Sequence, residues 1–477
     1  MNASSYGNKY HITIFGASHA PEIGVSIEGL PKDFRLDREA LQAFLNRRAP
    51  GKNEWSTARK EADEPLFTEG LSQDGYTDGS RLTAIIRNTD PHSADYDAFR
   101  SVPRPGHADY PAYRKSGQIP AGGGKWSGRM TAPLCIAGGI AKQLLEARGI
   151  QVMARIKSIG NYTDESPFNE SVEGKSFPAG SADPLLVKRF QETIAAAKAA
   201  GDSVGGTVEC QVLGLPVGLG EHPFLGLENR LSTIIFGIPA VKGLEFGDGF
   251  ALSRLRGSEA NDAYRMEDGR VVTLTNHCGG VLGGMSDGMP LHFRVAFKPT
   301  PTIAREQDSV DLLTGTDVRI AGKGRHDPCI VPRAVPVVEA AAACAVLDAL
   351  LEESEESLST GNEKPVTQVE TASLSREETL PAAASLSGEE IEALRARIDE
   401  ADQALLGAFL KRMEAAGQIA AYKKERGLPV FDPAREGRLL EKIAARTPEA
   451  FRSYTDDLYR TLLRLSKDYQ HALLKDK

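Results

Sequence analysis

The longest periodic stretch of the chain lies near its C-terminus, where apolar residues recur at spacings of three and four from Ile391 to Phe409. Ser387 with Glu390 forms a helix-capping pattern in front of this stretch, and Gly427 with Pro429 ends it. The pattern predicts one helix of about 40 residues, which is roughly 60 Å long at 1.5 Å per residue.

Two shorter helical patterns follow, over about 433–446 and 448–474, and complete an all-helical C-terminal part. A helix of about 40 residues with one apolar face is too long to bury that face within a monomer of this size. We therefore expect the C-terminal part to form dimers.

The chain before residue 352 has a different pattern, because it is rich in glycine and in short β-prone segments. Strand patterns such as "TVECQVLGLPVGLG" and "LHFRVAF" alternate with helical stretches such as "APLCIAGGIAKQLLEARG". This pattern predicts a mixed α and β domain over residues 1–351.

The segment between these parts is almost free of large apolar residues. From Glu352 to Ser387 it has eight Glu against one Lys and one Arg, together with many Ser, Thr and Ala. Such a composition cannot bury enough surface to fold alone. Residues 352–386 are therefore predicted to be a flexible linker between domains at 1–351 and 387–477.

Composition narrows the class of protein only modestly. The 477 residues carry a net charge of −8, which gives no indication of nucleic-acid binding. The five cysteines are scattered and form no CxxC pair, which argues for a reducing compartment and against a zinc site. The N-terminus has no signal-peptide pattern, and we find no run of about 18 apolar residues, so we expect a cytoplasmic protein without membrane spans.

Eight polar residues of the C-terminal part have a spacing that suits a binding site. Arg412 and Lys423 are 11 residues apart, close to three helical turns, and Ser466 and Gln470 share a helix face. Taken singly, each is more simply a solvated surface residue. The full set is Arg395, Arg412, Lys423, Asp432, Arg435, Glu436, Ser466 and Gln470.

With these residues the segment from "ALRARID" to "LSKDYQ" resembles the all-helical chorismate mutases. The resemblance implies a pericyclic rearrangement of chorismate to prephenate, which needs no nucleophile and no proton transfer. Arginines suit the two carboxylates of such a substrate. By the resemblance, the carboxylates would be held by Arg395 from a partner subunit, Arg412 and Arg435. Lys423 and Gln470 would donate to the ether oxygen, and Glu436 and Asp432 would hold the ring hydroxyl.

Two other interpretations of the C-terminal helices remain open. They could be a regulatory module that binds chorismate or an aromatic product, or a dimerisation module whose charges are solvated. A pure dimerisation module has no need for eight matching polar residues on three helices, which favours the mutase interpretation.

The N-terminal part carries several glycine- or histidine-bearing blocks. They are "FGASHAPEIGVSIEGLP", "LNRRAPGKNEWSTARKEAD", "RPGHADYPAY", "GGGKWSGRMTAP", "NHCGGVLGGMSDG", "FKPTPTI" and "GRHDPC". Singly, a glycine triplet is usually a turn, and a lone His19 or His107 is more often a structural residue. His326 and Cys329 lack a second ligand pair, so no metal site is predicted.

In this order the blocks resemble the chorismate synthase family over residues 7–350. The resemblance implies loss of phosphate from 5-enolpyruvylshikimate-3-phosphate to give chorismate, with reduced FMN as cofactor. It also implies a helical layer between two antiparallel sheets and assembly as a homotetramer.

The resemblance also assigns roles to individual residues. Asp327 would be the base that takes a proton from the flavin, His19 would stabilise or protonate the departing phosphate, and His107 would protonate the reduced flavin. Ser127 falls among the catalytic residues. The clamps for substrate phosphate and carboxylates would be Arg48, Arg129, Arg325 and Arg333. The residues implied to hold FMN are Lys125, Ser127, Gly283, Lys298, Thr300, Thr302 and Arg325.

The sequence departs from the family pattern beside these positions. The usual "GESHG" is "GASHA" here, so Ala17 and Ala20 are substitutions, and the usual "SSAR" is "WSGR", which introduces Trp126. The histidine, the second serine and the arginine are retained, so we expect activity. Glu54 stands where many relatives carry a basic residue, so NADPH is expected only as an indirect reductant.

Overall fold

The computed structural model describes residues 4–51, 62–88, 100–168, 177–178, 183–267, 269–322, 327–360, 388–426, 433–444, 447–448 and 452–475. The chain divides into two compact units, Met1–Pro365 and Val366–Lys477.

The N-terminal unit contains two five-stranded sheets, both antiparallel throughout. In spatial order, the first sheet comprises β1 (Ser5–Tyr6), β2 (His11–Gly16), β3 (Glu22–Glu28), β5 (Leu82–Arg87) and β4 (Leu66–Glu69). The second comprises β7 (Tyr162–Thr163), β6 (Gln151–Ile159), β8 (Gly206–Leu213), β14 (Leu291–Phe297) and β9 (Val241–Phe246).

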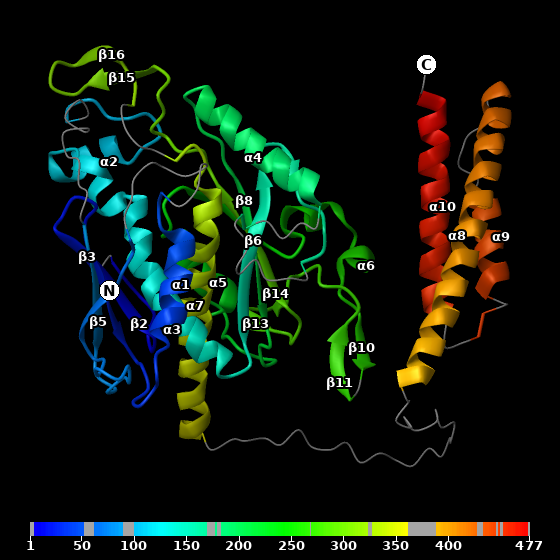
Figure 1. The fold of residues 1–477 in the computed structure, drawn as a ribbon, viewed down its shortest axis with the longest axis horizontal. Helices are drawn as coiled ribbons and strands as arrows, with labels where there is room; N and C mark the ends of the chain where they lie inside the picture. The colour runs from blue at the N-terminus through cyan, green and yellow to red at the C-terminus, as the bar shows by residue number, and fades with distance from the viewer. Residues whose placement is uncertain are drawn as a thin grey trace. The chain divides into compact units, whose positions relative to one another are not determined.

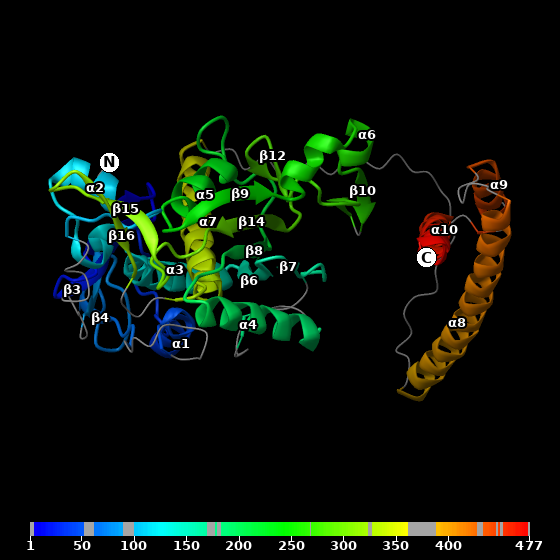
Figure 2. The same cartoon turned by 90° about the horizontal axis from the view of Figure 1, so that it is seen from above.

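Helices lie between the two sheets, as Figures 1 and 2 both show. The helix α3 (Thr131–Glu146) contacts strands of both sheets, and α7 (Val331–Thr360) contacts β6 and β8. The buried residues of α3 lie on all faces of the helix and are not confined to one stripe, as expected for a helix that is buried on all sides. The mixed α/β fold with antiparallel sheets is therefore confirmed.

The remaining elements of the unit are shorter or peripheral. The other α-helices are α1 (Arg38–Arg48), α2 (Asp109–Ser116), α4 (Pro184–Ala199), α5 (Leu227–Ile235) and α6 (Gly257–Ala260). The 3-10 helices are η2 (Ala121–Trp126), η3 (Gly128–Met130) and η4 (Gly249–Arg254). Three hairpins pair β10 (Tyr264–Glu267) with β11 (Arg270–Thr273), β12 (Val281–Leu282) with β13 (Met285–Ser286), and β15 (Gln307–Asp311) with β16 (Thr316–Ile320).

The helices α3 and α7 cross so closely that their backbones are in direct contact. A Cβ atom added to Gly138 of α3 would lie 2.2 Å from the Cα of Ala340 in α7, so only glycine fits there. The facing part of α7 is an alanine run, Ala340–Ala343, with no exposed surface. Small residues on both helices therefore set their separation.

A buried carboxylate fastens α7 to its neighbours. Glu339 accepts hydrogen bonds from Arg47 at 2.7 and 2.8 Å, from Lys142 at 2.9 Å and from the Ala154 amide at 3.1 Å. Burial raises the pKa of Glu339, but Lys142 and Arg47 outweigh that effect and lower it. An ionised carboxylate thus links α1, α3 and β6 to the central helix.

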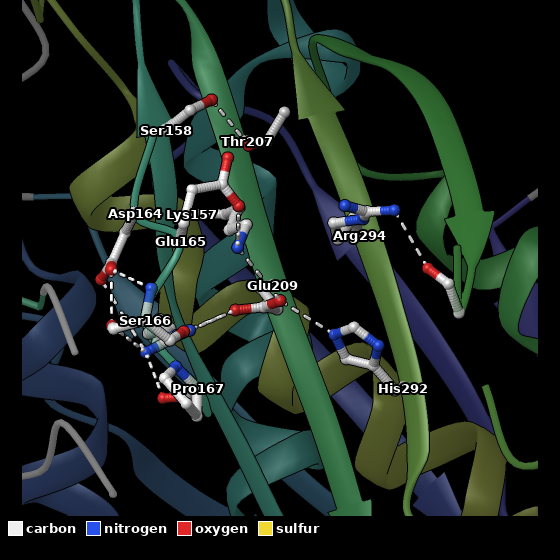
Figure 3. A network of polar contacts seen from close by, with 12 residues as sticks. Lys157, Ser158, Asp164, Glu165, Ser166, Pro167, Thr207, Glu209, His292 and Arg294 are labelled. Atoms are coloured by element: carbon white, nitrogen blue, oxygen red, sulfur yellow. Dashed lines mark hydrogen bonds and ion pairs between the residues drawn. The ribbon is translucent and has the colours of Figure 1, made fainter. Parts of the chain in front are cut away.

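The second sheet carries a polar network, shown in Figure 3. Glu209 of β8 lies at its centre, 2.8 Å from Arg155 and 2.9 Å from the Nε2 atom of His292. Burial raises the pKa of Glu209, but His292, Lys157 and Arg155 together lower it to about 2. The network therefore joins β6, β8 and β14 through a carboxylate that is ionised at neutral pH.

The helix α7 continues to Thr360, nine residues beyond the predicted domain end at 351. Glu352, the first residue of this extension, accepts a hydrogen bond from Asn8 at 2.6 Å and forms an ion pair with Arg230, which stabilises the start of the extension. The rest of the predicted linker, residues 361–386, lies outside the described residues.

Among the described residues, one segment is long enough and has a high enough mean hydropathy to cross a membrane, although charged residues interrupt its apolar runs. It is Val331–Glu353 of α7, and 89% of its most apolar window is buried inside the unit. The apolar character of this segment is that of a core helix between two sheets.

Three helices form the described part of the C-terminal unit: α8 (Gly388–Glu425), α9 (Pro433–Ala444) and α10 (Arg452–Lys475). Their bounds lie within a few residues of the predicted ones. The helix α10 packs against both α8 and α9. Leu405, Leu406 and Leu410 of α8 are more than half exposed, so part of its apolar surface is not covered within this chain.

Candidate active sites

A basic cavity of about 650 Å³ lies in the N-terminal unit, within the size range of ligand pockets. Its wall joins the end of α1, the glycine-rich η2, and segments next to β9 and β14. The N-terminal ends of α3 and α7 also reach it, and helix N-termini favour negative charge. The charged side chains of the described lining, apart from His107, are Arg48, Arg104, Lys125, Arg129, Lys242, Lys298, Arg333 and Asp327. Seven cations against one carboxylate indicate an anionic ligand.

Most of the predicted synthase residues line this cavity. They are Arg48, His107, Lys125, Ser127, Arg129, Lys298, Thr300, Thr302, Asp327 and Arg333. Gly283 lies in the exposed turn between β12 and β13 and is not among the lining residues that the structure describes. Arg325 lies outside the described residues.

His19 is not among the described lining residues, but it packs against Gly122 of η2, which lines the cavity. Gly122, Gly123 and Gly124 all have positive φ angles, which lets the loop pass close to side chains. A Cβ atom on Gly122 would lie 2.0 Å from the Cε1 atom of His19, and one on Gly123 would lie 3.0 Å from the Cε1 atom of His107. Both predicted histidines therefore pack directly against the glycine triplet, His19 on Gly122 and His107 on Gly123.

His107 is held by a buried carboxylate that sequence reasoning missed. Its Nδ1 atom lies 2.6 Å from Oδ1 of Asp109, which is fully buried. Arg104 donates to both oxygens of Asp109, at 2.7 and 2.8 Å. Burial raises the pKa of Asp109, but its hydrogen bonds with Arg104 and His107 lower it well below the usual range. The position of Asp109, two residues after His107, is a signal that could have been used.

Asp63 is a second buried carboxylate that the sequence reasoning missed. Its Oδ2 atom accepts from Nε of Arg48 at 2.7 Å, and its Oδ1 atom accepts from Nη1 of Arg129. Burial raises the pKa of Asp63, but Arg48, Arg129 and Arg333 outweigh that effect and lower it. Two predicted substrate clamps thus share one ionised acid.

Asp327, the predicted base, forms an ion pair with Arg333 at the cavity wall. Arg333 also donates from Nε to the backbone oxygen of Arg48, at 2.8 Å. The positions of Asp327, Arg333 and Arg48 are therefore coupled through direct contacts.

The loop after β14 contributes a group of polar residues at the cavity wall. Lys298 donates to the backbone oxygen of Gly106, and its pKa is lowered by burial and by nearby Lys242. Thr302 accepts from Arg104 at 3.2 Å. The Thr300 hydroxyl is buried and has no hydrogen-bond partner among the described residues, so a bound ligand could satisfy it.

Trp126, the departure from the family pattern, also lines the cavity. The Nζ atom of Lys125 lies 4.9 Å from the centroid of its indole ring, within the range of a cation–π contact. The substitution thus adds an aromatic surface to the cavity wall without removing Ser127 or Arg129 from it.

In the C-terminal unit, several predicted residues lie where α8 and α10 meet. Ser466 and Gln470 are buried, and the Ser466 hydroxyl lies 3.8 Å from the sulfur of Met413, next to Arg412. The Nε atom of Arg412 and the Oε1 atom of Gln470 are buried without a hydrogen-bond partner among the described residues. Such atoms suit a polar ligand.

The structure describes only some of the other predicted mutase residues in full. Lys423 of α8 is half-buried and Arg435 of α9 is exposed. Glu436 pairs with Lys467 at 3.1 Å, a contact that sequence reasoning missed. Arg395 lies in α8, but its side chain and the whole of Asp432 are outside the described residues.

The fold and the two sites define an enzyme with a cavity for an anionic ligand and a helical unit with buried polar atoms that have no hydrogen-bond partner among the described residues. Comparison with protein families agrees. A family described as chorismate synthase matches residues 10–351, and one described as chorismate mutase type II matches residues 394–471.

Individual relatives agree with the first match. The chorismate synthase of Lancefieldella parvula is 45% identical over 369 residues, which is 73% of this chain and 97% of the relative. That of Parabacteroides distasonis is 43% identical over 355 residues, or 73% of this chain and 98% of the relative. A solved chorismate synthase crystal structure, 25% identical, matches with a TM-score of 0.54 over 73% of this chain and 92% of that chain.

The chain belongs to the chorismate synthase family and carries a chorismate mutase type II domain after it. It is a bifunctional enzyme of aromatic biosynthesis.

Proposed function

We propose that the N-terminal unit eliminates phosphate from 5-enolpyruvylshikimate-3-phosphate with reduced FMN, and that the C-terminal unit rearranges the resulting chorismate to prephenate. The observation that supports the first step most directly is the cavity, whose described lining has seven cations and a single carboxylate. Its ligands are then a substrate with one phosphate and two carboxylates, and a flavin with one phosphate.

The cavity residues fit FMN. Lys298 and the Thr300 hydroxyl, which has no hydrogen-bond partner in the described part of the chain, lie together after β14 and suit a phosphate or a ring carbonyl. Phe236, Ile238 and Val337 supply apolar wall for a flat ring. Bound reduced FMN would lend electron density to the substrate ring so that phosphate can leave.

Arg48 and Arg129, which line the same cavity, bind and orient the substrate. Arg48 and Arg129 are nearly fully buried and share Asp63, so both guanidinium groups are oriented before the substrate arrives. Arginine is suited to phosphate and carboxylate because it can donate two parallel hydrogen bonds. Pre-positioned cations reduce the entropy lost on reaching the reactive geometry.

Two side chains are assigned to proton transfer, Asp327 and His107, and a third, His19, to the departing phosphate. The Asp327 carboxylate would accept the proton released from a bound flavin, and Arg333 pairs with that carboxylate at the cavity wall. His107, held through Nδ1 by Asp109, would protonate a bound flavin, and His19, next to the cavity residue Gly122, would stabilise the departing phosphate. A positioned acid or base contributes about 10²- to 10⁴-fold to such a step.

For the second reaction, Arg412 and Gln470 are the described residues that point most clearly to a ligand. Both have a buried polar atom without a partner among the described residues, at the junction of α8 and α10. Electrostatic preorganisation and selection of a compact conformer suffice for a pericyclic step.

The proposal includes assembly and location. Exposed apolar side chains within residues 217–285, such as Phe224 and Phe250, support a tetrameric synthase core, and Leu405, Leu406 and Leu410 support a mutase dimer. All five cysteines are free, which supports a reducing, cytoplasmic location.

The test is an anaerobic assay of the whole chain with the phosphorylated substrate and reduced FMN, following chorismate and prephenate together. Both products should form in sequence. Chorismate that accumulates without prephenate would favour a regulatory or dimerisation role for the C-terminal helices. A second reaction, with chorismate added to the isolated fragment 386–477, separates those outcomes.

A further inference from the structure

Asp63 has an unusual place for a charged residue. It has no exposed surface, it follows the segment 52–61 that lies outside the described residues, and it is not among the lining residues of the cavity. Nevertheless, it contacts the two most buried arginines of the cavity wall, Arg48 and Arg129. Asp63 thus stands directly behind the surface to which the substrate binds.

The two oxygens of Asp63 are divided between the two arginines. Oδ2 accepts from Nε of Arg48 at 2.7 Å, whereas Oδ1 accepts from Nη1 of Arg129. A single rigid carboxylate therefore fixes the separation of two guanidinium groups as well as their orientation. Hydrogen bonds that hold a binding side chain in place before the ligand arrives are the usual means of preorganisation.

Neutral groups complete the orientation of each arginine. Arg48 donates to the Thr131 hydroxyl at 3.0 Å, and Arg129 donates to the Asn88 side chain at 3.2 Å. Neither contact balances charge, so within the described residues Asp63 is the carboxylate that offsets both cations. Asp63 thus reduces the repulsion between two buried cations in a region of low dielectric constant.

The effect of Asp63 extends to the predicted base. The backbone oxygen of Arg48 accepts from Arg333, which pairs with Asp327. Arg333 also lies near enough to Asp63 to lower its pKa, so the charge of Asp63 acts on the cation beside the base.

From these contacts we propose that Asp63 is a positioning residue that sets the spacing of Arg48 and Arg129 for the phosphate or carboxylate groups of the substrate. This inference rests on the proposed synthase function. Asp63 does not touch the substrate, so it acts on substrate binding through the two arginines.

The chain offers a matched control in Glu339. It is a carboxylate of similar burial that also holds two basic side chains, Arg47 and Lys142, but none of these three residues lines the cavity. Glu339→Gln should lower stability as Asp63→Asn does, without changing substrate affinity. The pair separates a positioning role from a purely structural one.

The experiment measures KM and kcat for the phosphorylated substrate, the FMN dissociation constant and the melting temperature of the full chain. Asp63→Asn should raise KM by about 10- to 100-fold, the scale expected for a misplacement of about 1 Å. The FMN dissociation constant should stay within about threefold of wild type, because Lys298 and Thr300, which we assign to FMN, lie in the loop after β14, whereas Asp63 contacts Arg48 and Arg129. If Asp63→Asn does not fold, Asp63→Glu keeps the charge but moves the carboxylate by one methylene, and the same rise in KM is expected.

The proposal is overturned if a folded Asp63 variant keeps the wild-type KM, or if its KM and FMN dissociation constant rise by the same factor. Wild-type chain in the same assay tests the proposed function separately. No chorismate from wild type would overturn that function, whereas normal wild-type turnover with an unchanged KM in the variants overturns only the positioning role.

Discussion

Replacing Gly122 by alanine should damage the synthase reaction through His19. Gly122 has a φ angle of +59°, and its added Cβ atom would lie 2.0 Å from Cε1 and 2.3 Å from Nδ1 of His19. Ordinary contact begins at 3.4 Å, so the ring or the loop must move by about 1.4 Å. His19 would then leave the place that the glycine triplet gives it.

Two effects combine in this variant, and both have a known scale. A non-glycine residue in the left-handed region costs about 1–2 kcal/mol, which lowers the melting temperature by a few degrees. Misplacement of an active-site group by about 1 Å can lower turnover about 100-fold. Gly122→Ala should therefore lose about two orders of magnitude in synthase turnover while remaining folded.

Gly149→Ala is the control for backbone strain. Gly149 has a φ angle of +77°, and its added Cβ atom would meet nothing within 4 Å. It should lose a similar amount of stability but keep synthase turnover, and mutase activity should be unchanged in both variants. Normal turnover in folded Gly122→Ala, or an equal loss in Gly149→Ala, would refute the reasoning.

Asp327→Asn should lower chorismate formation by about 10²- to 10⁴-fold and leave mutase activity unchanged, and normal turnover would contradict its role as base. Arg412→Ala should abolish prephenate formation while synthase activity persists, as a coupled assay can show. Mixing inactive Arg395→Ala and Arg412→Ala chains should restore part of the mutase activity if the site is shared between subunits, and no recovery would contradict a shared site. Glu209, whose pKa falls from 4.5 to about 2 on folding, contributes stability that is complete above pH 4.5 and lost as the pH falls toward 2. That contribution is about 3 kcal/mol, so Glu209→Gln should flatten the acid limb of the stability curve measured by denaturant titration.

Local patterns predicted the individual elements well. The spacing of apolar residues and the flanking glycine placed the long C-terminal helix within a few residues of its observed bounds, Gly388–Glu425, because helix periodicity is a local property. The alternation in "LHFRVAF" likewise gave β14. Its place between β8 and β9 could not be predicted, because strand pairing depends on contacts distant in sequence.

The residues of the candidate site likewise fall into those that a local motif identifies and those that only the three-dimensional structure reveals. Residues within family motifs, such as Arg129 and Lys298, were identified from the sequence, and the structure brings them to one cavity. Asp63 was missed because its partner Arg129 lies 66 residues away along the chain. The extension of α7 past residue 351 was missed because the acidic composition there disfavours folding, while Arg230 and Asn8 compensate only in three dimensions.

The close crossing of α3 and α7 ties the interior of the molecule to its chemistry. Gly138 and Ala340 each lie seven residues after a cavity residue at the start of the same helix, namely Thr131 and Arg333. A methyl group added at the crossing would push α3 and α7 apart. Because Thr131 of α3 contacts Arg48 and Arg333 of α7 contacts Asp327, the N-terminal ends of the two helices would shift both of these side chains. A genetic screen for loss of chorismate formation would therefore recover substitutions at this crossing alongside those in the cavity, although no atom of Gly138 or Ala340 lines the cavity itself.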